Sequence, residues 1–252
     1  MLNRRHLFGA LPLAAASTAT AVAQTTERSQ DGVQTENLYD WGFLGPDHDF
    51  GAGISSGTKR GREIARAIDV LRDIPKTADH LGVATYFSTI NIANESCQSF
   101  AQEWQTKKTG PSNPLITMFH LLTNTMPNPQ DNVPWCAAFV SFCLRAGGKE
   151  SLWSYRALDY ADYPGLDVTA APRAGDIVVF RNTKGGGGHV TLFIAWDLDR
   201  RGRRVGLRCL GGNQGDRVKI STYPLDASRT LEAIRRPIAA KPLVEKAACT
   251  RG

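Results

Sequence analysis

The sequence predicts an α+β fold, in which helices form the first part of the chain and an antiparallel sheet forms the second. Apolar residues recur at helical spacing up to about residue 145, whereas short β-rich runs separated by Gly, Asn, Asp and Pro follow from residue 176. A helical part followed by a strand-rich part is typical of α+β domains. The 252 residues are 42% apolar and 21% charged, which favours a folded chain with a sizeable core.

The first 23 residues predict an export signal rather than part of the fold. Arg4 and Arg5 precede an apolar run at 7–16, and small residues end in Ala-Val-Ala at 21–23. The paired arginines resemble a twin-arginine signal. We therefore expect a periplasmic or secreted protein, with no stable membrane insertion once the signal is removed. The alternative is a frayed N-terminal helix of a cytosolic protein.

Five helices and five strands are expected along the chain. The first helix follows possible caps at 55–58 and ends before Pro75. The other helices are predicted at 77–90, 95–106, 114–125 and 135–145, and the strands at 176–180, 190–196, 204–210, 217–223 and 231–235. The helix at 114–125 has few polar positions, so we expect it to be buried.

The charge balance argues against nucleic acid as a partner. Without Arg4 and Arg5 the 30 basic residues become 28, which against 24 acidic residues leaves a net charge of +4. The densest basic cluster, at 200–204, is predicted to be a solvated hairpin turn rather than a binding surface.

The five cysteines leave at least one free thiol, because their number is odd. Their spacing to one another and to histidines fits no zinc site, so we expect no structural metal. Cys143 and Cys209 are predicted to be buried core residues. Cys97 and Cys249 could form a bridge between the helical part and the tail.

Cys136 is the candidate nucleophile. Asp131 or Asn132 can cap the helix predicted to start near Pro134, which puts Cys136 in its first turn. Backbone N–H groups and the helix dipole at that position lower the pKa of a thiol. The alternative is a buried structural cysteine.

His189 and Asn213 are the candidate partners of this thiol. His189 opens a strand directly after the glycines at 185–188, where a substrate backbone can approach closely. Asn213 lies in a turn at the end of the next strand, and its side-chain oxygen could accept the other ring N–H of the histidine. The alternatives are an exposed loop histidine and an ordinary turn asparagine.

Four blocks carry these residues, namely PWCAAFVSFCL at 134–144, AGDIVVF at 174–180, GHV at 188–190 and LGGNQ at 210–214. They resemble the bacterial papain-like cell-wall hydrolases of the NlpC and CHAP (cysteine, histidine-dependent amidohydrolase/peptidase) families, most closely an exported sub-group. The resemblance extends over roughly residues 77–237. It implies a papain-like fold, with N-terminal helices and the nucleophile helix packed on a central antiparallel sheet.

The resemblance also implies roles for individual residues. Cys136 matches the nucleophile, His189 the general base and acid, and Asn213 the residue that orients the histidine. Two departures stand out. CHAP enzymes often have a glutamate two residues before the asparagine, where this chain has Gly211, and the third histidine usual in NlpC enzymes does not follow His189. No metal or organic cofactor is implied.

These observations divide the chain into five parts. We predict an export signal at 1–23, an extended lead segment at 24–58, a helical prelude at 59–130, a cysteine hydrolase domain at 131–237 and a tail at 238–252. Candidates for lining the substrate groove are Trp135, Trp153, Tyr155, Gly188 and Gln214. For Trp135, packing under the helix is the favoured alternative.

The function predicted is cleavage of amide or peptide bonds of peptidoglycan by a Cys-His-Asn triad, with stem peptides as the substrate. Two alternatives remain open. An antibacterial toxin of the same chemistry would have a cognate immunity protein or inhibitor as a partner. A wall-binding module with a decayed triad would keep the fold, and the missing glutamate favours that reading.

Overall fold

The computed structural model describes residues 58–105, 110–121, 123, 130–225 and 229–241. The predicted export signal, nearly all of the lead segment and Cys249 lie outside these ranges. In the part of the chain that the structure describes, no helix has both the length and the apolar character needed to cross a membrane.

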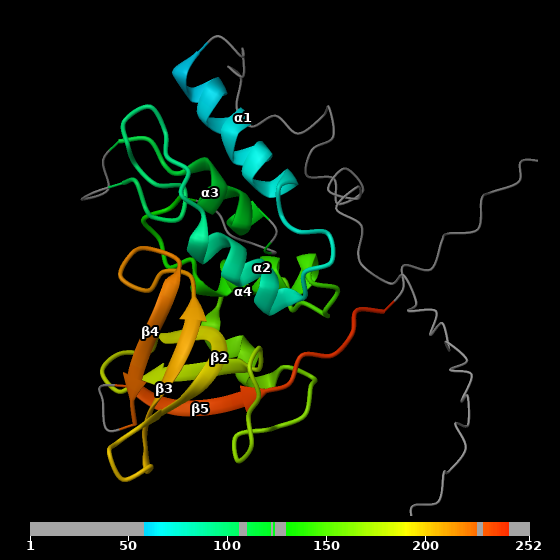
Figure 1. Cartoon of the computed structure of the whole chain (residues 1–252), viewed down its shortest axis with the longest axis vertical. Helices are drawn as coiled ribbons and strands as arrows, with labels where there is room; N and C mark the ends of the chain where they lie inside the picture. Colours follow the sequence, from blue (N-terminus) through cyan, green and yellow to red (C-terminus); the bar gives the residue numbers. More distant parts are fainter. Residues whose placement is uncertain (1–57, 106–109, 122, 124–129, 226–228, 242–252) are drawn as a thin grey trace, which may run out of the picture. The chain divides into compact units, whose positions relative to one another are not determined.

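The structure confirms the α+β class, with four α-helices and a five-stranded antiparallel sheet in the described ranges (Figure 1). The helices are α1 (Lys59–Arg72), α2 (His80–Thr89), α3 (Pro114–Leu121) and α4 (Cys136–Ala146), and a short 3₁₀ helix, η2, spans Ala157–Asp162. The strands are β1 (Ile177–Asn182), β2 (Gly188–Leu198), β3 (Arg204–Gly211), β4 (Lys219–Pro224) and β5 (Arg229–Arg235). All five predicted strands and four of the five predicted helices are present, with ends shifted by a few residues.

Side-chain caps set the start of the first two helices. The Thr58 hydroxyl accepts a hydrogen bond from the Gly61 N–H at the start of α1, and the Asp79 carboxylate accepts one from the Gly82 N–H at the start of α2. Both bonds satisfy backbone donors that have no partner inside the helix. The capped helices can then turn one apolar face toward the core.

An aromatic cluster joins the helical prelude to α4. The ring of Phe87 on α2 lies 5.2 Å from Phe119 on α3, 5.9 Å from Phe139 and 5.6 Å from Phe142, both on α4, measured between centroids. These edge-on contacts are favourable beyond the area they bury. Residues on both sides of the predicted boundary at 130/131 therefore share one core.

The helix predicted at 95–106 is wrong over its described part. Residues 95–105 form turns and isolated bridges instead. The buried Asp131 carboxylate accepts hydrogen bonds from the N–H groups of Trp104 and Asn113, and Asn113 in turn donates to the carbonyl of Phe100. Side chains distant in sequence thus satisfy backbone groups that a helix would have paired locally.

The sheet has the strand order β4-β3-β2-β1-β5 and separates two apolar layers. Val190 on β2 pairs with Val179 on β1, and both belong to the core that contains the helices. The neighbouring pair, His189 with Phe180, lies on the other face, since successive residues of a strand alternate. Register alone therefore decides which β2 side chains meet α4.

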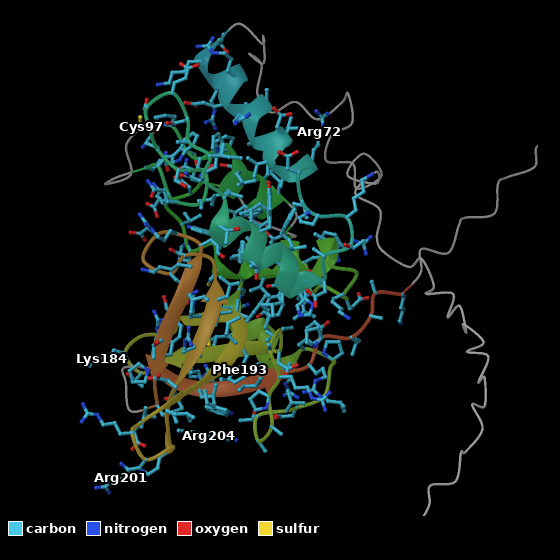
Figure 2. The ribbon with its side chains drawn as sticks, viewed as in Figure 1. Arg72, Cys97, Lys184, Phe193, Arg201 and Arg204 are labelled. Carbon is cyan, nitrogen blue, oxygen red and sulfur yellow. The ribbon has the colours of Figure 1, made fainter. Side chains whose placement is uncertain are left out.

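The basic cluster at 200–204 is the predicted hairpin turn, between β2 and β3. Figure 2 shows Arg201 and Arg204 at the end of the sheet remote from the helices. Asp199 accepts hydrogen bonds from Arg203, and the guanidinium of Arg204 lies 4.3 Å from the ring centroid of Trp196. Local contacts thus pair the charges of Arg203 and Arg204.

The two cysteines predicted to be core residues are buried. Cys143 and Cys209 are fully buried. Cys97 is exposed and lies far from the sheet in Figure 2, and its predicted bridge to Cys249 stays a prediction because Cys249 lies outside the described residues. The described start of the tail is held by main-chain bonds to residues 148–150.

Candidate active site

Cys136 is the first residue of α4 and is 4% exposed. No side chain caps this helix, whose N-cap position is Trp135. The cap expected from Asp131 or Asn132 is therefore wrong, because the Asp131 carboxylate is bound to the N–H groups of Trp104, Gln105 and Asn113. An uncapped start leaves backbone donors available near the thiol.

The Cys136 sulfur accepts hydrogen bonds from backbone N–H groups, among them those of Val190 on β2 and Ala137 on α4. These bonds and the charge of Arg229 favour the thiolate. Burial is the larger effect, however, and it raises the pKa of the Cys136 thiol above its ordinary value. The lowered pKa expected from the helix position is thus outweighed, and the resting group is a neutral thiol.

His189 is the second residue of β2 and is 5% exposed. Its ring packs on Tyr223 of β4, with 5.6 Å between centroids and 35° between planes. Burial first, and then the charge of Arg229, lower the pKa of His189 to about 3, so the imidazole is neutral in the resting state. Its Nε2 atom is buried and has no hydrogen-bond partner among the described residues.

The His189 ring donates a hydrogen bond to the side-chain oxygen of Gln214, a contact that by itself raises the pKa of the imidazole. The Gln214 carbonyl oxygen also accepts a hydrogen bond from the Tyr223 hydroxyl, and its amide nitrogen donates to backbone carbonyls of Cys209, Gly211 and Lys219. Gln214 is 3% exposed, so it lies behind the histidine rather than along a groove. Its predicted place as a groove residue is wrong.

Asn213 occupies the turn between β3 and β4 with a φ of +55°, in the left-handed region that asparagine tolerates. Among the described residues no hydrogen bond of its side chain is found, to His189 or to any other group. The triad role expected of Asn213 stays a prediction, and the side chain in contact with the His189 ring is that of the neighbouring Gln214.

The structure brings the thiol to the strand residue that follows the histidine. The Cys136 sulfur is bonded to the Val190 N–H, whereas the His189 ring is turned to the sheet face that carries Tyr223. The thiol and imidazole are not hydrogen-bonded to each other. Catalytic hydrogen bonds are often formed only in the substrate complex, so this arrangement is compatible with a resting cysteine–histidine pair.

A pocket of about 360 Å³ opens beside Cys136. The start of α4 forms one wall, η2 with the residues before it forms a second, and the glycine loop forms a third. The lining residues are Val133, Pro134, Cys136, Tyr155, Arg156, Ala157, Leu158, Gly186, Gly187 and Gly188. Of the predicted groove residues, Tyr155 and Gly188 lie in this lining.

Gly188 is required by the close approach of η2 to β2. A Cβ atom at this position would lie 2.5 Å from a methyl group of Leu158 and 2.7 Å from the Phe180 carbonyl oxygen, both too close to coexist with it. The absence of a side chain therefore lets η2 and the strand meet next to the thiol.

The two predicted tryptophans do not line the pocket. Trp135 is fully buried, and a Cβ at Gly212 would lie 2.4 Å from its ring, so the tryptophan fills the space under the helix start. Trp153 packs against the helical core, with the Arg145 guanidinium 5.5 Å from its ring centroid. Packing under the helix was the expectation for Trp135, and a groove role for either residue is not supported.

The described residues offer no cluster of three or more His, Cys, Asp or Glu side chains suited to a metal ion. The most unusual carboxylate outside the pocket is Glu103, whose pKa is raised to about 7 by burial and by the charges of Asp216 and Asp131. The backbone N–H of Glu103 donates to the Asp216 carbonyl, which joins the prelude to the β3–β4 turn.

Comparison with known families matches this region. Residues 128–205 match the CHAP domain. The match contains Cys136 and His189 and supports a CHAP-type, papain-like cell-wall hydrolase, which indicates amidase or peptidase activity on peptidoglycan. No match was found among curated proteins or among solved structures.

The match ends before residues 210–214, so the partner of the imidazole rests on the structure alone. Tyr223 and Arg229, which also surround the histidine, were not predicted from the sequence. Nothing in a strand-end tyrosine or an arginine after a loop distinguishes them, because their proximity to His189 depends on the pairing of β4 with β3 and of β5 with β1.

Proposed function

We propose that the protein is an exported cysteine hydrolase that cleaves an amide or peptide bond in the stem peptides of peptidoglycan. One observation carries the proposal. The CHAP match contains both Cys136 and His189, and the fold places this cysteine at an uncapped helix start, in a pocket beside the strand that carries the histidine. Export is proposed from residues 1–23, which lie outside the described ranges.

In the proposed reaction the Cys136 thiol gives its proton to Nε2 of His189 as the sulfur attacks the substrate carbonyl carbon. Backbone N–H groups at the α4 start stabilise the resulting oxyanion. The C–N bond then breaks, and the amine leaves with the proton from His189. Water, deprotonated by His189, attacks the thioester, releasing the new carboxylate and restoring the thiol.

The pocket lining supports a peptide substrate that carries a carboxylate. Val133, Pro134 and Leu158 provide apolar walls, and Arg156 provides a cation whose side chain is 67% exposed. The guanidinium lies 3.6 Å from Asp159, an exposed pair that a substrate carboxylate can replace at little cost. Peptidoglycan stems are short acidic peptides, and this combination suits them.

Digestion of purified sacculi tests the proposal. The wild type is expected to release fragments with new amino and carboxyl ends, identified by mass spectrometry, whereas Cys136→Ala releases none. The fragment masses also identify the bond that is cleaved, which distinguishes an amidase from an endopeptidase.

A second candidate, a wall-binding module without activity, is favoured by the missing thiol–imidazole hydrogen bond. If the wild type and Cys136→Ala both sediment with sacculi and neither releases fragments, the protein is a wall-binding module and the proposed hydrolase activity is wrong.

A further inference from the structure

We propose that Gln214, held in place by Tyr223, is the positioning residue for His189, the role that the sequence pattern gives to Asn213. The inference rests on the proposed function for its catalytic meaning. The assignment of the ring nitrogen of His189 that carries the proton does not depend on that function.

The orientation of the Gln214 amide is determined by its surroundings. Its Nε2 atom donates to the carbonyls of Cys209, Gly211 and Lys219, at 3.3 Å and 3.1 Å for the first two. A flipped amide would place its oxygen against these three acceptors, which is unfavourable. The Oε1 atom therefore faces the side where Tyr223 and His189 lie.

Tyr223 holds this oxygen and the imidazole together. Its hydroxyl donates to Gln214 Oε1, and its ring packs on the ring of His189. The guanidinium of Arg229 lies 5.5 Å from the Tyr223 ring centroid, and Arg229 also donates to the Asn182 side chain at 3.2 Å. Strands β4 and β5 thus both support the histidine.

The tautomer of His189 follows from this arrangement. Gln214 Oε1 can only accept, so the ring nitrogen bonded to it must carry a hydrogen. Because Nε2 has no partner, that nitrogen is Nδ1. The neutral ring then keeps its Nε2 lone pair free, which is the form that can take a proton from Cys136.

The space around Gly211 agrees with this assignment. A Cβ at Gly211 would lie 2.4 Å from Thr191 Oγ1 and 3.3 Å from the Gln214 amide nitrogen. A glutamate could not be accommodated there without displacing both groups. The Gln214 amide therefore occupies the neighbourhood in which an acidic residue at 211 would stand.

The test compares Gln214→Met with Asn213→Gly. Methionine is similar in length to glutamine and lacks the acceptor, and glycine adopts the positive φ of position 213 without strain. Long-range ¹⁵N–¹H NMR of the His189 ring reports the tautomer, with His189→Gln used to assign the signals. Hydrolysis of sacculi by the same proteins reports catalysis.

We expect the Nδ1–H tautomer in the wild type and in Asn213→Gly, and its loss in Gln214→Met. We also expect kcat to fall by about a hundredfold or more in Gln214→Met, because a wrong tautomer disables the base. Tyr223→Phe should give a smaller loss, since the ring contact with His189 remains.

Retention of the Nδ1–H tautomer in Gln214→Met, or a loss of tautomer in Asn213→Gly alone, would overturn the proposal. A folded wild type with the expected tautomer and no hydrolysis would overturn the proposed function instead. The two failures are therefore distinguishable, because the NMR measurement needs no activity. If Gln214→Met does not fold, the same two measurements are made on Gln214→Leu.

Discussion

At the residue scale, the protonation states of Cys136 and His189 are set by burial. Burial raises the pKa of the thiol and lowers the pKa of the imidazole to about 3, so both groups are neutral near pH 7. Proton transfer would then accompany attack on the substrate rather than precede it. This differs from a resting thiolate–imidazolium pair.

Alkylation of the free protein by iodoacetamide checks this state. The thiolate is the reactive form, and a raised pKa means that little of it exists below the ordinary pKa of a thiol, about 8.5. We expect alkylation of the Cys136 peptide, followed by mass spectrometry, to be slow near neutral pH and to rise steadily above about pH 8.5. Exposed Cys97 serves as the accessible reference within the same chain. A fast, pH-independent rate at Cys136 would show a resting thiolate.

The sequence predicts the positions of the two candidate catalytic residues better than those of the side chains that contact them. Cys136 and His189 stand in blocks whose local pattern places one at a helix start and the other at a strand start, as the structure confirms. The side chain in contact with the His189 ring is that of Gln214, which directly follows a residue with a φ of +55°. A single unusual dihedral angle is invisible in residue spacing.

At the scale of elements, residues 95–105 show how long-range contacts override a predicted helix. The sequence predicts a helix over 95–106, but Asp131 and Asn113, both outside that range, satisfy backbone groups of its described part. Asp131 is fully buried, and its Oδ2 accepts three backbone N–H bonds.

Replacing Asp131 by Ala should therefore destabilise the whole fold. Three buried donors lose their acceptor, which is expected to lower the free energy of unfolding by about 2–4 kcal/mol in urea denaturation. Asp131→Asn is the matched control. It keeps one acceptor oxygen, and its amide nitrogen can take the place of Oδ1, which has no partner, so a smaller loss is expected. Equal free energies of unfolding for the wild type and Asp131→Ala would show that the hydrogen bonds of Asp131 do not stabilise the fold.

At the scale of the whole molecule, buried histidines in both layers make the fold sensitive to acid. Burial lowers the pKa of His80 on α2, that of His120 on α3 to about 4, and that of His189 on β2 to about 3. In the unfolded chain histidine titrates near 6.5. As the pH falls below about 6.5, the unfolded state binds protons that the folded state cannot bind, so stability decreases.

Urea unfolding at about pH 7 and about pH 4.5 measures this coupling. Between these values His120 alone is expected to cost the wild type on the order of 2 kcal/mol. His120→Leu removes that titration and should lose correspondingly less stability over the same interval. Equal losses in the two proteins would show that His120 is protonated in the fold.

The class and the order of elements were predictable, because helical and alternating patterns occupy separate parts of the chain. The shared core was not. The contacts of Phe87 with Phe139 and Phe142 join segments that the sequence divides at 130/131. Likewise, the hydrogen bonds between residues 148–150 and 238–240 depend on where α4 ends relative to β5. Such contacts follow from packing and leave no periodic signal.

The most direct test of the account is the trapping of an acyl-enzyme on Cys136. Wild-type protein is mixed with soluble peptidoglycan fragments, quenched in acid within the first turnovers and digested for mass spectrometry. We predict a thioester adduct on the peptide that contains Cys136, carrying the acyl side of the cleaved bond, and no adduct in Cys136→Ala. Hydrolysis that proceeds equally in Cys136→Ala, with no adduct in either protein, would contradict the proposal that Cys136 is the nucleophile.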